Sequence, residues 1–293
     1  MRQHKLCRLT ALVTLGLLFV FHISSGEDTL VPSVELLSED LAANLIDPIT
    51  VAKAPIFKQG EQLRFKLGWS FFKVAKATMQ VEPDSYEGKA ALKISLDTKT
   101  NSFADAFYKV RNSSTSWVAE DMSRSFEYKA VQEEGDRDRD TQAFFDPVSS
   151  TARYINNKNG ESQGPVNILP GTFDPLGIVF FIRTLDFDVG DELVIPTSNG
   201  KEFFYTIVRV VDKVTKRFRF GKMEAFVLEP DIKDIGGVFK RSKDGHLRFY
   251  FSADERKLPL RMESEVAVGK FWAELVEVVE PVEDDSVTVA EVQ

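Results

Sequence analysis

Cysteine and histidine are scarce in this sequence of 293 residues. The one cysteine is Cys7, and of the three histidines only His246 lies beyond residue 26. The chain after residue 26 therefore has no disulfide, no thiolate nucleophile and no sulfur ligand for a metal. A single histidine is also too few for a zinc site made of two or three imidazoles. We expect no metal site, no cofactor and a fold that is stabilised by packing.

Familiar nucleotide-binding motifs are absent too. Neither a phosphate-binding Walker loop nor the Gly-x-Gly-x-x-Gly pattern of dinucleotide sites occurs. His246 follows the turn signal Asp244-Gly245, where a surface position is the ordinary interpretation and a catalytic role the rarer one. The alternating charges of residues 136–140 put aspartates on one side of a strand and arginines on the other, as in a solvated hairpin. Little in the sequence favours an enzyme.

The first 26 residues have the order of a secretory signal peptide. Three basic residues precede an apolar run at residues 9–23, and small residues follow at 24–26. The run is shorter than the ~20 residues that span a bilayer, so we expect cleavage after Gly26 and no stable membrane span afterwards. Cys7 lies before the run, on the wrong side for the lipid-bearing cysteine of a lipoprotein.

Acidic residues outnumber basic ones in the expected exported part. Without the three basic residues of the leader, 34 Lys and Arg face 45 Asp and Glu, a net charge of −11. Nucleic acids and anionic membrane surfaces attract proteins with clustered positive charge. We therefore expect no nucleic acid partner and no electrostatic binding to anionic lipid.

Alternating apolar residues predict antiparallel strands through most of the chain. Leu63, Phe65, Leu67 and Trp69 alternate with polar or small residues, and the same period of two returns at 75–81 and 92–96. Residues 83–88 predict the turn between the last two runs. Further strands are expected at residues 116–119, 126–133, 137–145, 151–156, 192–196, 202–211, 223–229, 247–252, 258–263 and 270–278. Short turns such as Asn159-Gly160 and Asn199-Gly200 between them favour an antiparallel sheet over β–α–β units.

One apolar segment breaks the strand pattern and predicts a helix. Asp174 is expected at its N-cap and Pro175 at its first position, with Phe180 or Phe181 pointing inward and Arg183 near the end at Leu185. A shorter helical turn is expected within residues 102–110. We predict a mainly β fold with one long, curved antiparallel sheet, open or a half-barrel, whose concave side is closed by these one or two short helices. Asp174 and Arg183 would then cap and anchor the helix.

The two ends of the chain differ from the middle. After the signal peptide, 1–26, residues 27–55 form an acidic arm or linker with a helix expected at 33–46. The β half-barrel domain is expected at residues 56–281. Residues 282–293 are acidic and are expected to be a disordered tail.

Phenylalanine is unusually frequent, with 24 Phe against 6 Tyr and 3 Trp. A ring without a polar group suits a deep apolar interior. Aromatic residues at positions expected to face inward are the candidate ligand-binding residues: Phe65, Trp69, Phe107, Phe180, Phe203, Phe249, Phe251 and Trp272. They fit a solid core, the more ordinary interpretation, or a concave face that holds an apolar ligand such as an acyl chain.

Several motifs, taken in order, resemble a bacterial family. They are residues 57–63 (FKQGEQL) leading to Trp69, 103–111 (FADAFYKVR), 174–176 (DPL) before the helix ending at Arg183, Asp254 with Leu258-Pro259, and 269–271 (GKF). Together they resemble domain-of-unknown-function family thirty-one-zero-eight, over residues 56–279. The resemblance implies a periplasmic, β-rich domain similar to the half-barrels of lipoprotein carriers, with no established activity and no binding residue to transfer.

Three functions stay open at this stage. The first is an exported, non-enzymatic envelope binding or carrier module that takes an apolar small molecule or lipid on a phenylalanine-lined concave face. The second is an envelope glycan hydrolase that uses two carboxylates, which 45 acidic residues leave unidentified. The third is a structural module that binds an envelope protein through a sheet edge. All three imply the bacterial periplasm.

Overall fold

The computed structural model describes residues 43–48, 57–58, 60–231, 246–266 and 269–280. The expected signal peptide and acidic tail lie outside the described residues. The strands are β1 Gln62–Trp69, β2 Phe72–Tyr86, β3 Lys89–Thr100, β4 Val110–Ala119, β5 Ser125–Glu134, β6 Arg137–Asp146, β7 Thr151–Asn156, β8 Ser162–Asn167, β9 Glu192–Ser198, β10 Phe203–Phe218, β11 Gly221–Pro230, β12 His246–Ser252, β13 Pro259–Val266 and β14 Gly269–Val279. Two helices accompany them in the described residues, α4 Ser102–Asp105 and α5 Gly177–Thr184.

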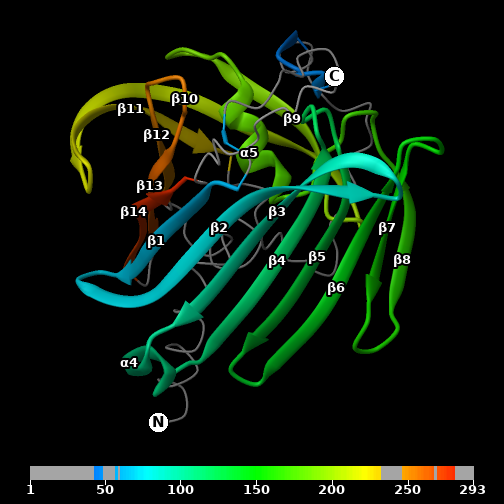
Figure 1. The fold of residues 1–293 in the computed structure, drawn as a ribbon, viewed down its shortest axis with the longest axis horizontal. Coiled ribbons are helices and arrows are strands. Elements are labelled where there is room, and N and C mark those ends of the chain that lie inside the picture. Colours follow the sequence, from blue (N-terminus) through cyan, green and yellow to red (C-terminus); the bar gives the residue numbers. More distant parts are fainter. Residues whose placement is uncertain (1–42, 49–56, 59, 232–245, 267–268, 281–293) are drawn as a thin grey trace, which may run out of the picture.

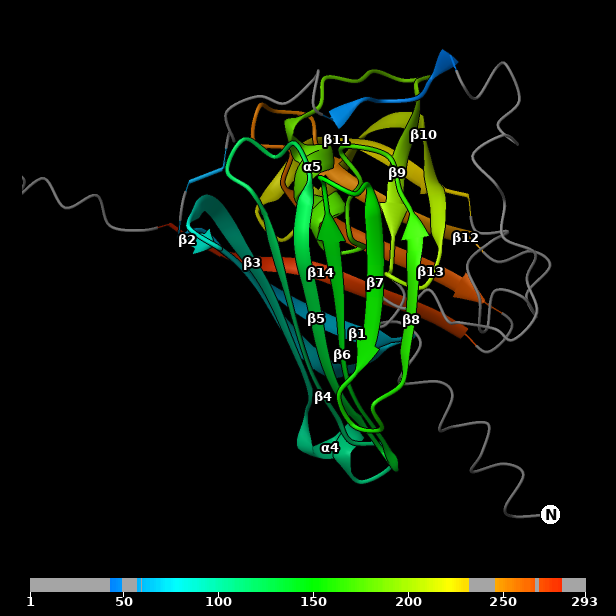
Figure 2. The same cartoon turned by 90° about the vertical axis from the view of Figure 1, so that its right-hand side faces the viewer.

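All fourteen strands form one antiparallel sheet that does not close into a barrel. Its order is β8-β7-β6-β5-β4-β3-β2-β1-β14-β13-β12-β11-β10-β9, so two meanders meet where β1 pairs with β14. Bulges interrupt the pairing at several places, including Leu67/Gly68 in β1 and Val210/Asp212 in β10, and a bulge bends a strand. The result is a strongly curved sheet (Figures 1 and 2). The predicted fold class is confirmed.

The two outer strands of the sheet are protected in different ways. Along β9, Phe173 and Leu45 each form a parallel bridge, with Thr197 and Val194 respectively. Leu45 belongs to the acidic arm, so part of the arm covers this edge. The opposite edge strand, β8, carries Pro165, which has no N–H to offer to another strand.

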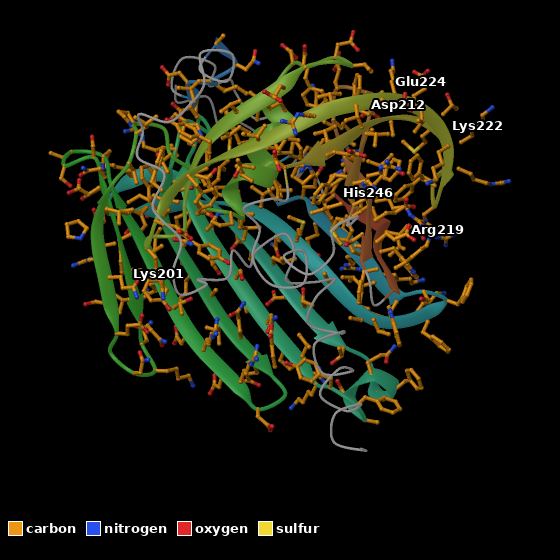
Figure 3. All side chains as sticks on the ribbon, turned by 180° about the vertical axis from the view of Figure 1, so that it is seen from behind. Lys201, Asp212, Arg219, Lys222, Glu224 and His246 are labelled. Atoms are coloured by element: carbon orange, nitrogen blue, oxygen red, sulfur yellow. The ribbon has the colours of Figure 1, made fainter. Side chains whose placement is uncertain are left out.

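The β9–β10 turn brings the two ends of the sheet together. Gly200, in this turn, has a φ of 84° and so little room that a Cβ would lie 2.8 Å from Ala143 Cβ in β6 and 2.9 Å from the Arg153 carbonyl oxygen in β7. The neighbouring Lys201 pairs with Glu161 over 3.3 Å, and Figure 3 shows Lys201 against the strands of the first meander. Side-chain contacts therefore bridge the gap that backbone pairing leaves open.

Helix α5 fills the concave side at one end of the sheet (Figure 1). Of its eight residues only Val179 is less than fully buried. Phe180 meets Phe57 edge to face at 5.2 Å, and Phe181 stacks on Phe173 at 4.6 Å. At this end the interior is a solid core of aliphatic and aromatic side chains.

The long hairpin of β10 and β11 curls over the outer side of the sheet. Phe218 packs edge to face on Tyr250 of β12 at 6.0 Å, and Lys216 pairs with Glu263 of β13 over 3.2 Å. Charged residues such as Asp212 and Glu224 project away from the hairpin, and His246 is exposed at the start of β12 (Figure 3). Phe218 thus belongs to the packed part of the fold.

Four local predictions need correction. Strand β2 runs to Tyr86, so the turn expected at 83–88 shrinks to its last residues, because Pro83 and Asp84 still pair with β3. Strand β8 was not expected, since its exposed residues show no alternation. Helix α5 begins at Gly177 instead of Pro175. In the arm, Leu45 forms a β-bridge where a helix was expected, and residues 33–42 of that helix lie outside the described residues.

Candidate functional site

The concave side of β1 to β6 carries three rungs of inward-facing residues, which we call the inner wall. Residues of one rung are register partners on neighbouring strands. From the α5 end outward the rungs are Leu63, Met79, Leu96, Ser114, Ala130 and Thr141; Phe65, Ala77, Thr98, Asn112, Gln132 and Arg139; and Leu67, Ala75, Thr100, Val110, Glu134 and Arg137. Side chains alternate along a strand, so each rung lies two residues from the next.

The chemistry of the inner wall changes from strand to strand. The β1 and β2 positions are all apolar, and their continuation into β14 is Leu275 and Ala273. From β3 onward most positions are polar, such as Thr98, Asn112 and Gln132, although one apolar residue remains on each of β3, β4 and β5. The β6 positions end in Arg137 and Arg139, both exposed. The inner wall is therefore amphipathic across the sheet: it is apolar at β1 and β2 and mostly hydrogen-bonding from β3 to β6.

Asn112 and Glu134 form the most distinctive pair on this wall. Asn112 Nδ2 donates to Glu134 Oε1 over 2.6 Å, while Asn112 Oδ1 is buried and accepts a hydrogen bond from no described residue. Burial raises the pKa of the Glu134 carboxyl, against the opposing effects of this hydrogen bond and of Arg139 and Arg137. A buried acceptor without a donor is costly, so it is a place where a ligand hydroxyl or ammonium group would be stabilised.

Asp174 lies at the junction of α5 with β4 and β5 and is fully buried. Its Oδ2 accepts from the hydroxyls of Ser116 at 2.5 Å and Ser125 at 2.6 Å, and its Oδ1 accepts from the backbone N–H of Leu176 and Gly177. Burial raises the pKa of Asp174, and the four hydrogen bonds oppose that rise. The carboxyl caps the first amides of α5 although Leu176 holds the N-cap position. Its partners are all protein groups, so it fixes the helix to the sheet.

Arg183, near the other end of α5, is fully buried as well. Its Nη1 donates to Glu61 Oε1 over 2.8 Å, and its Nε donates to the carbonyl oxygen of Arg256 over 3.2 Å. The guanidinium also lies over the rings of Phe57 and Phe180, at 5.0 and 5.3 Å. Burial lowers the pKa of Arg183, and Glu61 counteracts this effect. Arg183 thus anchors the helix to the start of β1.

The eight candidate aromatic residues separate into three groups. Phe65 lies in the inner wall, and Trp69 follows Phe65 and Leu67 on the inward-facing side of β1. Phe249 continues the third rung beyond Leu67, through Ala273 and Met262. Phe180, Phe203 and Phe251 are buried in the core. Phe107 and Trp272 lie elsewhere. Whether the inward-facing ones bind a ligand stays a prediction.

The expectation that Phe107 and Trp272 face inward is wrong. Phe107 is 61% exposed, because it lies in the turn between α4 and β4, where the alternation of a strand does not apply. Trp272 is the register partner of Gly68 and faces away from the inner wall, with Nε1 donating to the Ser70 carbonyl oxygen over 2.9 Å. A Cβ on Gly68 would lie 2.1 Å from the indole, so the glycine makes room for it.

One serine motif of the sequence remains to be placed in the structure. Residues 160–164 read Gly-Glu-Ser-Gln-Gly, the letters of a nucleophile elbow. That elbow requires a serine on a strand-to-helix turn. Ser162 instead begins the exposed edge strand β8. The context that would make this motif catalytic is not met.

Several residues of these sites were not anticipated. Asn112, Ser116 and Ser125 are polar residues at inward-facing positions, and alternation of apolar residues identifies no polar residue on a buried face. Glu61 lies in the segment 57–63 that carried the family resemblance, but nothing in its spacing pointed to Arg183. Among the described residues, no group of three His, Cys, Asp or Glu side chains could hold a metal ion. Within that same part of the chain, no helix is both long and apolar enough for a membrane crossing.

The comparison with protein families decides what the chain is related to. A family model described as “Protein of unknown function (DUF3108)” matches residues 64–276. The chain belongs to this family. The predicted resemblance is therefore confirmed, and the match covers strands β1 to β14 of the DUF3108 fold seen here.

Two solved structures of other bacterial proteins are similar to this chain. One is a β-barrel-like protein of the domain of unknown function DUF1849 from Brucella abortus, with a TM-score of 0.45 and 9% identity over 77% of this chain and 98% of that chain. The other is a protein of Parabacteroides distasonis named as a candidate lipoprotein, with a TM-score of 0.29 and 10% identity over 78% of this chain and 99% of that chain. No curated protein matches this member of the DUF3108 family.

Proposed function

We propose that this protein is an exported, non-enzymatic binding or carrier module of the bacterial envelope that shelters an amphipathic ligand on its inner wall. The acyl chain of such a ligand lies along the apolar positions of β14, β1 and β2. Its polar head group lies against the hydroxyl and amide groups of β3 to β6. The observation that carries the proposal is the contrast between the wholly apolar wall positions of β1 and β2 and the mostly polar wall positions of β3 to β6.

The polar half of the wall argues against an interior that exists only as a core. Thr98, Gln132 and Glu134 face inward and are buried. Burying polar groups is costly unless they are paired. Glu134 accepts from Asn112 Nδ2, whereas Asn112 Oδ1 on the same wall accepts from no described residue. At the α5 end of the sheet the buried polar groups Asp174 and Arg183 are paired within the protein, and the rung nearest to them is mostly apolar. Polar residues are thus concentrated on the part of the wall that lies farther from α5.

A binding role also fits the acidic residues of the site better than hydrolysis does. Glycosidases work with two carboxylates ~5–10 Å apart across a cleft. Glu134 has Val110 and Arg137 as its register partners in the wall. Asp174 and Glu61 are each held by several hydrogen bonds from the protein. These three acids support the fold or the wall.

The envelope location rests on the leader. Residues 1–26 combine a basic start, an apolar run and small residues, the order that directs secretion. N-terminal sequencing of the protein recovered from the periplasmic fraction tests this, with Glu27 expected as the first residue.

Displacement of a fluorescent lipid tests the ligand proposal. The exported protein is titrated with dansyl-undecanoic acid, and the bound probe is then competed with monomyristoylglycerol. We expect saturable binding that the competitor reverses. Ala77→Leu adds volume at the centre of the apolar half and should weaken binding by roughly tenfold. Lys76→Leu, on the next residue and the opposite face, is the matched control and should bind as the wild type does.

Two results would overturn the proposal. The first is a wild-type protein that shows no displaceable binding while its circular dichroism spectrum is that of a folded β protein. The second is an Ala77→Leu variant that melts like the wild type and binds the probe equally well, because the probe would then lie away from the inner wall.

A further inference from the structure

Four phenylalanines form an exposed patch that the binding function does not use. Phe71 is 98% exposed, Phe107 61%, and Phe72 and Phe103 56% each. Phe71 and Phe72 lie at the β1–β2 turn, whereas Phe103 and Phe107 lie in and just after α4. We call these four residues the phenylalanine tip. Large apolar side chains gathered in one exposed patch mark an interaction surface.

The rings of the tip are in contact with one another. Phe72 stacks on Phe103 with ring centroids 6.0 Å apart, and Phe103 meets Phe107 at 5.5 Å with an interplanar angle of 63°. Two separate turns of the chain therefore build one aromatic surface. Phe71 extends it from the β1–β2 turn.

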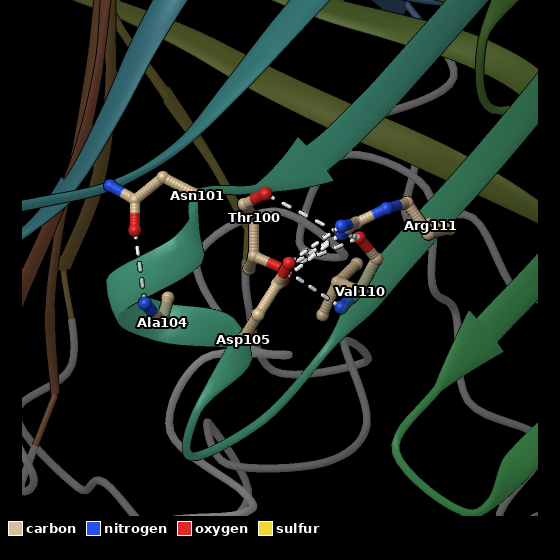
Figure 4. A network of polar contacts seen from close by, with 6 residues as sticks. All are labelled: Thr100, Asn101, Ala104, Asp105, Val110 and Arg111. Atoms are coloured by element: carbon tan, nitrogen blue, oxygen red, sulfur yellow. Dashed lines mark hydrogen bonds and ion pairs between the residues drawn. The ribbon is translucent and has the colours of Figure 1, made fainter.

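A polar network holds the two turns in place (Figure 4). Asn101 caps α4 through the N–H of Ala104, and its Nδ2 donates to the carbonyl oxygen of Lys73 at the start of β2 over 2.7 Å. Arg111 pairs with Asp105 through two hydrogen bonds, of 3.1 and 2.7 Å, and so ties α4 to β4. The phenylalanine tip is therefore preorganised, because these hydrogen bonds fix the backbone of the two turns that carry its exposed rings.

The tip lies at the end of the inner wall that is farthest from α5. The third rung, which includes Leu67, Ala75 and Thr100, borders both turns. Figure 1 shows α4 and the β1–β2 turn at the end of the sheet opposite α5. Two exposed lysines, Lys73 and Lys109, flank the rings.

We propose that the phenylalanine tip docks the protein on the surface of a lipid bilayer by inserting its rings among the head groups and upper acyl chains. The rings then lie in the interfacial region, and the ammonium groups of Lys73 and Lys109 lie at the level of the lipid phosphates. Docking there brings the wall's outermost rung to the membrane.

The shape and the local charge of the tip favour a bilayer over a folded protein. The rings project from two tight turns, so a protein partner would need a matching cavity, whereas lipid head groups move aside. The net charge of −11 expected for the exported chain does not oppose docking, because charges more than about 8 Å away are largely screened at physiological salt. Beside the rings, the charge of Asp105 is paired with that of Arg111, whereas Lys73 and Lys109 are exposed.

Vesicle flotation tests this proposal. The exported protein is mixed with vesicles of phosphatidylethanolamine and phosphatidylglycerol, and separately with vesicles of phosphatidylcholine alone. We expect the wild type to float with both, because ring insertion does not require anionic lipid. Phe71→Ser combined with Phe107→Ser removes two rings that lie outside the Phe72–Phe103 stack. It should lower the vesicle-bound fraction by at least about tenfold.

Val148→Ser is the matched control. Val148 is 91% exposed in the β6–β7 turn, at the α5 end of the sheet, so its variant should float as the wild type does. Wild-type protein that stays with the unbound fraction overturns the proposal and leaves the tip to a protein partner. Flotation of the double variant at wild-type levels overturns it too. Dansyl-undecanoic acid binding in solution should be the same in the double variant, which separates docking from ligand binding.

Discussion

Glu61 and Arg183 lie 122 residues apart in the sequence and form an ion pair of 2.8 Å between side chains that are both fully buried. Glu61 directly precedes β1, and Arg183 is in the last turn of α5, so the pair joins the helix to the centre of the sheet. Arg256, which is partly exposed, pairs with the second oxygen of Glu61 over 2.9 Å. The carboxylate therefore has two cationic partners, whereas Arg183 has one anionic partner among the described residues.

This asymmetry predicts unequal costs for removing the two partners. Glu61→Gln leaves the buried guanidinium without a counter-charge and should lower the free energy of unfolding by about 3–5 kcal/mol. Arg183→Met should cost less, roughly 1–3 kcal/mol, because Glu61 keeps Arg256 and the thioether still packs on Phe57 and Phe180. Urea unfolding of both variants measures the difference. Equal losses would show that Arg256 does not compensate Glu61.

The fold was predictable because most of its strands show an alternation of apolar and polar residues in the sequence. Leu63, Phe65 and Leu67 face the interior and their polar neighbours do not, so the period of two in the sequence is the period of the pleat. Strand β8 could not be found in this way, because all of its residues except Val166 are exposed and they show no alternation. The join of β1 with β14 has no local signal either, since it connects residues that are far apart in the chain.

The site was less predictable than the fold, for a physical reason. Hydrophobic alternation identifies faces that are buried against apolar neighbours, and two of the three wall positions are polar in each of β4 and β5. Asn112 and Glu134 are recognised as a pair only once the register of β4 with β5 is known, because it makes them diagonal neighbours within hydrogen-bond distance. For Phe107 and Trp272 the error was the opposite one: an inward-facing position was predicted wrongly. In the sequence, a bulky apolar residue on an exposed turn or over a glycine cannot be told from a core residue.

Gly200 is expected to be sensitive to a methyl group in a way that Gly160 is not. Both have a positive φ, 84° and 75°, so alanine at either position strains the backbone by about 1 kcal/mol. At Gly200 the added Cβ also collides with Ala143 and the Arg153 carbonyl, whereas nothing lies within 4 Å at Gly160. Gly200→Ala should therefore cost ~1–3 kcal/mol more than Gly160→Ala in thermal unfolding. Equal melting temperatures would mean that the two ends of the sheet do not meet at this turn.

Asn112 should contribute to the recognition of a polar head group. Asn112→Ala removes the buried acceptor and leaves the apolar half of the wall unchanged, so the affinity for monomyristoylglycerol should fall roughly fivefold, the loss of about one hydrogen bond. Probe displacement measures the affinity. Ser113→Ala, on the exposed face of the same strand, is the control and should leave it unchanged. An Asn112→Ala variant with wild-type affinity for this competitor would place its glycerol group elsewhere.

Asp174 should make the stability of the protein fall as the pH rises. Its pKa is raised by burial in the folded state, from an ordinary value of 3.8, so the folded chain holds this proton where the unfolded chain has lost it. The stabilisation is complete below the unfolded pKa and disappears as the pH passes through the raised, folded-state pKa. Asp174→Asn keeps an acceptor for the amides of Leu176 and Gly177 and carries no charge. We therefore expect the free energy of unfolding of the wild type, relative to this variant, to decrease as the pH rises above the ordinary aspartate pKa of 3.8. A difference that stays constant, or grows with pH, would show that the four hydrogen bonds outweigh burial and that the folded protein prefers the carboxylate.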